Sequence, residues 1–115
     1  MPDMPRRYRA RAWDAVNRRY CPRDAVYVGR ASLGWPGTPW ANTPFDRSGT
    51  VAQRLAAQAE SVRQYRERAI ARLAVEPDWL LPLRGRDLLC WCEDGAPCHA
   101  TVLLELLKER YDADA

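Results

Sequence analysis

The sequence has no long apolar run. None of its stretches approaches the roughly 20 apolar residues of a membrane span, and its first ten residues, MPDMPRRYRA, are charged where a signal peptide would be apolar. We therefore expect a cytoplasmic protein with no membrane partner. Because thiols stay reduced in that compartment, we expect the four cysteines to be buried, metal-bound or reactive rather than paired in disulfides.

Lysine is almost absent: the chain has one lysine, Lys108, and seventeen arginines. Seven of these arginines lie in residues 1–23 with two aspartates, a local charge of +5, which leaves −2 for the remainder of a chain whose net charge is +3. A basic leading segment can contact the phosphates of a nucleic acid. We do not favour that partner, since aromatic residues are not interleaved there as a stacking surface requires. A solvated helix face explains the same arginines.

The length of 115 residues suits one domain over residues 1–115. We divide it into a basic N-terminal helix within residues 1–23, with helical spacing from residue 7 to 20, and an α/β core over residues 24–110. In the core, DAVYVGR and RDLLCWC are typical of buried strands. Apolar residues at threes and fours predict a helix over residues 50–75, capped by Ser48 or Thr50.

Glycine and proline interrupt the chain between residues 29 and 49, where four glycines and three prolines predict a loop. Its aromatic residues, Trp35, Trp40 and Phe45, argue against disorder. A terminal helix is predicted to start at Pro97. The order strand, loop, helix, strand, helix predicts a small layered α/β domain, with a short, mainly parallel sheet and a right-handed, Rossmann-like connection. Two strands make a small sheet, so a third is expected from the loop or from the partner in a homo-oligomer.

Three of the four cysteines and the only histidine lie within ten positions, in CWCEDGAPCH. On a strand Cys90 and Cys92 share one face, while Cys98 and His99 follow at a helix N-terminus. Zinc binding by these four residues is one interpretation. We rank it last and predict no cofactor, because adjacent helical residues diverge by about 100° and Cys98 and His99 would not point at one ion.

Two other interpretations rank level. The first is an anion-binding or reactive pocket at the carboxyl end of the strand. There the free N–H groups and the dipole of the following helix favour a phosphate and lower the pKa of a thiol, which makes Cys98 a candidate catalytic nucleophile. His99 is the candidate general acid or base, or a hydrogen-bond partner of the ligand. The second is structural, because cysteine is often buried and a lone histidine often packs.

The segments VYVGR, WANTPF and LRGRDLLCWCEDGAPCHATVLLELL together resemble a family of small bacterial and phage proteins known as domain of unknown function 4326. The resemblance covers residues 26–107, and its LRG, CWC and CH elements are specific in combination. This chain departs from the family pattern by one extra residue between Trp40 and Phe45 and by Ala100-Thr101 after the histidine, where the family has Gly-Asp. The resemblance implies no activity.

The resemblance implies a site that joins distant segments. Gly29, Arg30 and Asn42 fall on the family pattern, as do Cys90 and Cys92, and the loops after both strands should open at one edge of the sheet. We therefore expect these five residues to bind a small anionic ligand, such as a nucleotide or phosphate, in a pocket that is either a binding site or an active site. The alternative is a non-catalytic interaction module, for instance a phage protein that binds a host partner, with buried structural cysteines.

Overall fold

The strand that carries Cys90 lies at the centre of a three-stranded parallel sheet. The computed structural model describes residues 5–10, 25–32, 35–92 and 95–112. The strands are β1 (Arg7–Arg9), β2 (Val26–Tyr27) and β3 (Leu88–Cys90), in the order β1-β3-β2. Arg9 pairs with Cys90, and Tyr27 pairs with Leu89. This arrangement confirms the predicted small α/β domain with a parallel sheet.

The third strand comes from the N-terminal segment. A helix was predicted to start at residue 7, and this part of the prediction is wrong, because Arg7–Arg9 is β1. Residues 11–24, which hold the rest of the predicted helix, lie outside the described residues. Backbone bonds flank the pairing, since the Ala10 N–H donates to the Cys90 carbonyl at 2.7 Å and the Leu88 N–H to the Arg6 carbonyl at 2.9 Å. The third strand, which we expected from the loop or from a dimer partner, therefore comes from the N-terminal segment.

Two helices follow the predicted pattern. Helix α2 (Val51–Val75) begins after a capping box, in which the Thr50 hydroxyl accepts from the Gln53 N–H and the Gln53 side chain accepts from the Thr50 N–H. Helix α3 (His99–Leu107) begins after its N-cap Cys98 and runs on as a π-helical turn, η2 (Lys108–Asp112). A short 3-10 helix, η1 (Leu81–Leu83), precedes β3. No described helix is long and apolar enough to cross a membrane.

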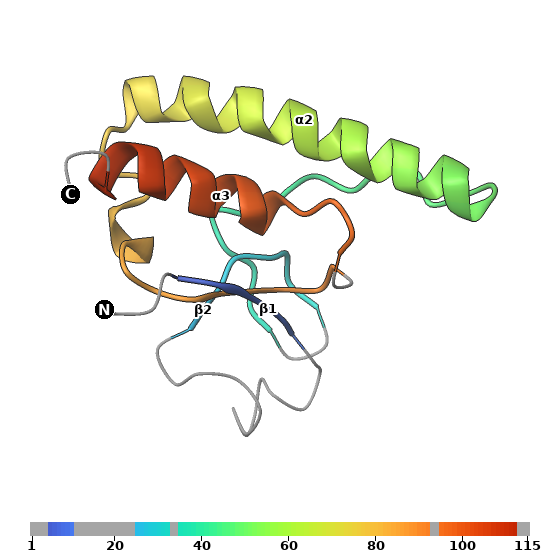
Figure 1. Cartoon of the computed structure of the whole chain (residues 1–115), viewed down its shortest axis with the longest axis horizontal. Coiled ribbons are helices and arrows are strands. Elements are labelled where there is room, and N and C mark those ends of the chain that lie inside the picture. The colour runs from blue at the N-terminus through green and yellow to red at the C-terminus, as the bar shows by residue number, and fades with distance from the viewer. Residues whose placement is uncertain (1–4, 11–24, 33–34, 93–94, 113–115) are drawn as a thin grey trace.

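Both α-helices cover one side of the sheet (Figure 1). The main core lies between them and the strands, and β3 divides its side chains as predicted, since Leu88 and Cys90 join this core whereas Leu89 joins a smaller one with Tyr27 and Trp35. The main-core side chains that lose nearly all solvent contact are Val28, Leu80, Leu83, Leu88, Cys90, Cys98, Ala100 and Leu103. Each face of the sheet therefore packs against its own apolar cluster.

Helix α2 buries only the later part of its predicted apolar face. Tyr65, Ala69 and Leu73 are buried at a spacing of four residues. Val51 and Leu55 continue the apolar spacing that predicted this helix, but they are 62% and 44% exposed. The first turns of α2 extend past the sheet, where no described element covers them (Figure 1).

The loop over residues 29–49 is held by side-chain hydrogen bonds along its described length. The indole N–H of Trp40 donates to the Trp79 carbonyl at 3.0 Å, and the Tyr65 hydroxyl donates to the Trp40 carbonyl at 2.6 Å. Trp35 is 5% exposed and packs in the smaller core. The aromatic residues of the loop therefore fix its course over the body of the protein, as their number predicted.

Candidate functional site

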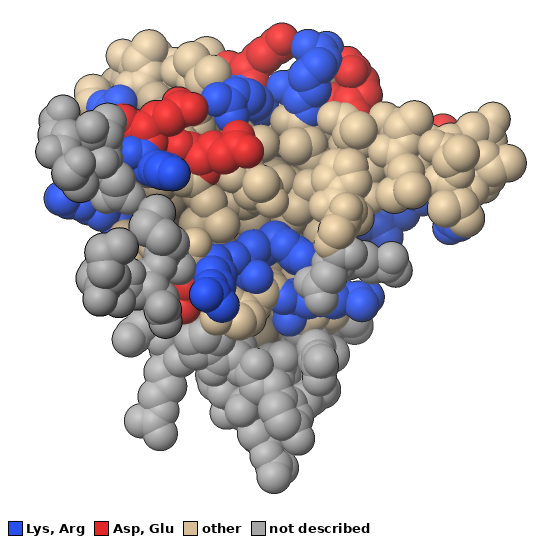
Figure 2. Space-filling view, viewed as in Figure 1, with Lys and Arg blue, Asp and Glu red and all other residues tan. Residues whose placement is uncertain are grey.

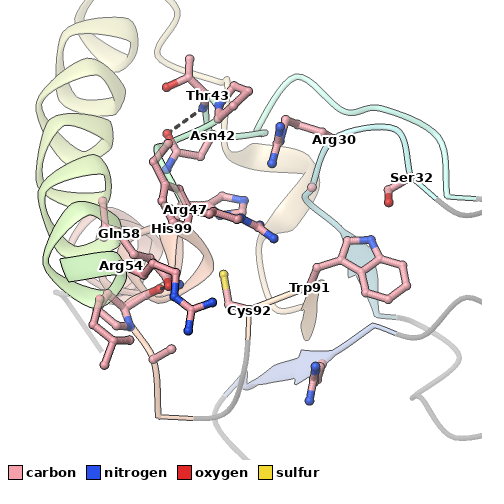
Figure 3. A pocket seen from close by; sticks show the side chains of 18 of the residues that line it. Arg30, Ser32, Asn42, Thr43, Arg47, Arg54, Gln58, Trp91, Cys92 and His99 are labelled. Carbon is pink, nitrogen blue, oxygen red and sulfur yellow. Dashed lines mark hydrogen bonds between the residues drawn. The ribbon is translucent and has the colours of Figure 1, made fainter. Parts of the chain in front are cut away.

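A pocket opens where the chain leaves the carboxyl ends of the strands (Figure 3). It has a volume of about 950 Å³, and its lining includes Gly29, Arg30, Asn42, Cys92 and His99. These five residues were singled out from the sequence, and the parallel pairing of β2 with β3 brings their segments together. The other two candidates, Cys90 and Cys98, are 0% and 2% exposed and do not line the pocket.

Four arginines line the pocket: Arg9, Arg30, Arg47 and Arg54. Among the described lining residues none is acidic, and none of the four arginines forms an ion pair within the described part of the chain. Figure 3 shows the side chains of Arg30, Arg47 and Arg54 around one space near Cys92. In Figure 2, by contrast, most acidic side chains on the visible face lie over the helices. Within the described part of the chain, the pocket therefore concentrates positive charge that no acidic lining residue neutralises.

Three of these arginines were missed by the sequence analysis. Arg9 was assigned to a helix, and strand pairing with β3 is what places it at the pocket. Arg47 and Arg54 lie beyond the last matched residue of the loop motif, in the segment that leads into α2 and in its first turns. No local pattern distinguished them from the other arginines of the chain.

The N-terminal end of α3 borders the same pocket. Pro97 and His99 are lining residues, and Gln58 of α2 donates from its side chain to the Pro97 carbonyl. The N-cap Cys98 makes no side-chain capping bond, and the first turn holds no acidic residue. The first N–H groups of a helix and its dipole attract anions. This helix end thus adds to the positive potential of the arginines.

His99 is fixed in a buried position. Its Nε2 lies 2.8 Å from the Val28 carbonyl, which can only accept, so that Nε2 carries the proton. The ring also meets the edge of Tyr65, with 5.2 Å between centroids. Burial lowers the pKa of His99 below its ordinary value, although the bond to Val28 acts in the opposite direction. His99 is therefore a buried side chain that ties α3 to the end of β2.

Asn42 lines the pocket, but its amide is engaged within the protein. The Nδ2 group donates to the Ser61 hydroxyl at 3.0 Å, and Oδ1 accepts from the Thr43 N–H and from Arg68, both at 2.8 Å. These bonds fasten the loop to α2. Asn42 therefore positions the pocket wall, and direct binding of an anion by its amide stays a prediction.

Three thiols meet beneath the pocket. The Sγ atoms of Cys90, Cys92 and Cys98 all lie within 4.8 Å of one another, and those of Cys90 and Cys98 are 2.9 Å apart. Arg7 reaches them from β1, because its Nη1 donates to Cys90 Sγ at 3.2 Å and to the Cys92 carbonyl at 2.9 Å. This group of three can hold a metal ion, and His99 is not part of it. We call these three residues the thiol cluster.

The thiols of the cluster shift in opposite directions in their pKa values. Hydrogen bonds from Cys92 and Cys98, and then from Arg7, lower the pKa of Cys90 far below its ordinary value. The hydrogen bonds to Cys90 and Cys92, with burial, raise the pKa of Cys98. We expected the helix N-terminus to lower the pKa of Cys98, whereas these hydrogen bonds and burial act in the opposite direction. A catalytic role for Cys98 stays a prediction.

Comparison with known proteins places the chain in a family. Residues 12–109 match the family described as Domain of unknown function (DUF4326). The chain belongs to this family. The match confirms the resemblance drawn from the LRG, CWC and CH elements. The thiol cluster and the pocket lining, except Arg9, lie within the matched range. No curated protein and no solved structure matches this member of the family.

Proposed function

We propose that this member of the DUF4326 family binds a small anionic ligand, of the nucleotide or phosphate class, in the pocket at the carboxyl ends of its strands. The observation that carries the proposal is the set of four arginines that line the pocket with no acidic residue among the described lining. Guanidinium groups pair with phosphate oxygens through two parallel hydrogen bonds, which makes arginine the favoured residue for such ligands.

The remaining lining supports a nucleotide over free phosphate. Phe45 and Trp91 offer aromatic surface in the same pocket, and base stacking on aromatic rings contributes about 1–3 kcal/mol per base. A volume of about 950 Å³ lies in the range of small-molecule sites. In this assignment the arginines and the end of α3 bind the phosphate, and the rings contact the base.

Titration calorimetry on the full chain tests the proposal with inorganic phosphate, adenosine triphosphate and adenosine. We expect the triphosphate to bind most tightly, phosphate more weakly and uncharged adenosine least, since the arginines supply most of the binding. Arg30→Ala and Arg54→Ala should each weaken triphosphate binding roughly tenfold, because each removes a hydrogen bond to a charged group. Arg63→Ala is the matched control, since Arg63 lies on α2 outside the pocket and pairs with Glu60 and Glu67.

Comparison of Arg30→Ala with the control Arg63→Ala decides between an anion-binding protein and an interaction module. If the triphosphate does not bind, or if Arg30→Ala and Arg63→Ala weaken it equally, the pocket is not its site. That outcome would favour the alternative of a non-catalytic interaction module, which no observation yet tests. Chromatography of the titration mixture shows whether the triphosphate is converted to a product. Such turnover tests the predicted catalytic roles of Cys98 and His99.

A further inference from the structure

The three sulfur atoms of the thiol cluster have the spacing of metal ligands. A tetrahedral zinc ion with bonds of about 2.3 Å requires sulfur atoms about 3.8 Å apart. The separations here run from 2.9 Å between Cys90 and Cys98 to at most 4.8 Å within the cluster, so they bracket the required value. Movements of about 1 Å or less would bring all three sulfur atoms to one ion.

The backbone explains how three separated cysteines converge. Cys90 ends β3, Cys92 follows on the same side, and Cys98 is the N-cap of α3. The chain turns between them through Gly95, whose φ of 82° is in the left-handed region that glycine adopts most readily. His99 turns away to Val28, which agrees with the divergence expected of adjacent helical residues. We ranked a metal site last because Cys98 and His99 could not both point at one ion. A site made of three cysteines does not require His99.

Charge favours the same interpretation. Three thiolates around a divalent ion leave one negative charge, which is costly in a buried place without a cation beside it. Arg7 supplies that cation, and its hydrogen bonds to Cys90 Sγ and to the Cys92 carbonyl are the kind that orient the ligands of a metal from outside. Soft thiolate ligands select zinc over hard ions such as magnesium and calcium.

We propose that Cys90, Cys92 and Cys98 bind one Zn²⁺ ion through their Sγ atoms, with Arg7 offsetting the excess negative charge and water as the fourth ligand. No fourth cysteine, histidine or carboxylate joins the cluster among the described residues. Cys92 is the half-buried member and lines the pocket, so the ion lies under the pocket floor. Under the proposed function the anion is bound by the arginines and the end of α3, whereas the metal ligands are the three sulfur atoms, so zinc binding does not depend on anion binding.

Elemental analysis of the full chain, purified under reducing conditions without added metal, tests the site. We expect one zinc per chain, and its loss in Cys92→Ser, which alters the most accessible of the three ligands. Arg63→Ala, a change on the exposed face of α2, should keep the metal. Zinc that stays in Cys92→Ser, or that leaves equally in Arg63→Ala, would overturn the assignment.

Cobalt substitution gives a second measurement that needs no variant. Co²⁺ added to the metal-free chain should produce the visible bands of a tetrahedral site and a near-ultraviolet thiolate band. A metal-free chain without cobalt bands would refute the proposal. So would a native chain in which mass spectrometry finds Cys90 and Cys98 joined in a disulfide.

Discussion

Replacing Gly29 by alanine should disturb the wall of the pocket through Tyr27. A Cβ at this position would lie 2.4 Å from the Tyr27 hydroxyl oxygen and 2.6 Å from the ring carbon that carries it, so the ring must move. The ring is 5% exposed, stacks on Trp35 with centroids 4.9 Å apart, and donates its hydroxyl to the Arg30 carbonyl at 2.6 Å. Gly29→Ala therefore threatens a hydrogen bond, a ring contact and the position of an arginine of the pocket.

The expected cost is about 2 kcal/mol in the free energy of unfolding. A hydrogen bond contributes about 1 kcal/mol, and an aromatic pair contributes about 0.5–1.5 kcal/mol beyond its buried area. Urea unfolding followed by circular dichroism measures the change. Gly37→Ala is the matched control, because its Cβ would meet Ala31 no closer than 3.4 Å, an ordinary contact.

A double-mutant cycle isolates the cause. In a Tyr27→Leu background the clash is relieved, so adding Gly29→Ala should cost less than about 0.5 kcal/mol, and the difference between the two backgrounds measures the coupling. If Gly29→Ala costs no more than Gly37→Ala in the native background, or costs the same in both backgrounds, the reasoning from Tyr27 is refuted.

Three further predictions concern the frame of the site. Thr50→Ala should destabilise the chain by about 1 kcal/mol through loss of the capping box, whereas Ser48→Ala should cost less than about 0.5 kcal/mol; equal urea midpoints would contradict this. Leu103→Ala should cost about 2–5 kcal/mol because its side chain is fully buried, while Leu55→Ala, at a 44% exposed position, should stay under about 1 kcal/mol in the same assay. Deleting residues 1–10 removes β1 and should lower the thermal midpoint of unfolding. The intact chain should show no tight, salt-sensitive binding of DNA or RNA in fluorescence anisotropy. If the intact chain shows such binding and the deletion abolishes it, the N-terminal arginines contact nucleic acid.

Local patterns determined much of the helical part of the fold. The spacing of apolar residues located α2 nearly to the residue, and Thr50 was one of two caps that the sequence offered. The alternation of side chains along Leu88, Leu89 and Cys90 was also correct, because period and polarity are properties of neighbouring residues. Membership of the family followed from short motifs in the same way.

The site depended on contacts that no local pattern contains. Arg7 meets Cys90 across 83 positions of sequence, and it does so only because β1 pairs in parallel with β3. Helical periodicity in the N-terminal segment pointed elsewhere, and sheet pairing overrode it at Arg7–Arg9. The residue types and spacing of the cysteines were visible in the sequence, but whether three sulfur atoms face one point depends on the backbone between them. The sequence by itself therefore determined which chemical groups are present, whereas the tertiary structure decided which of them meet, because distance in space is set by long-range pairing and packing.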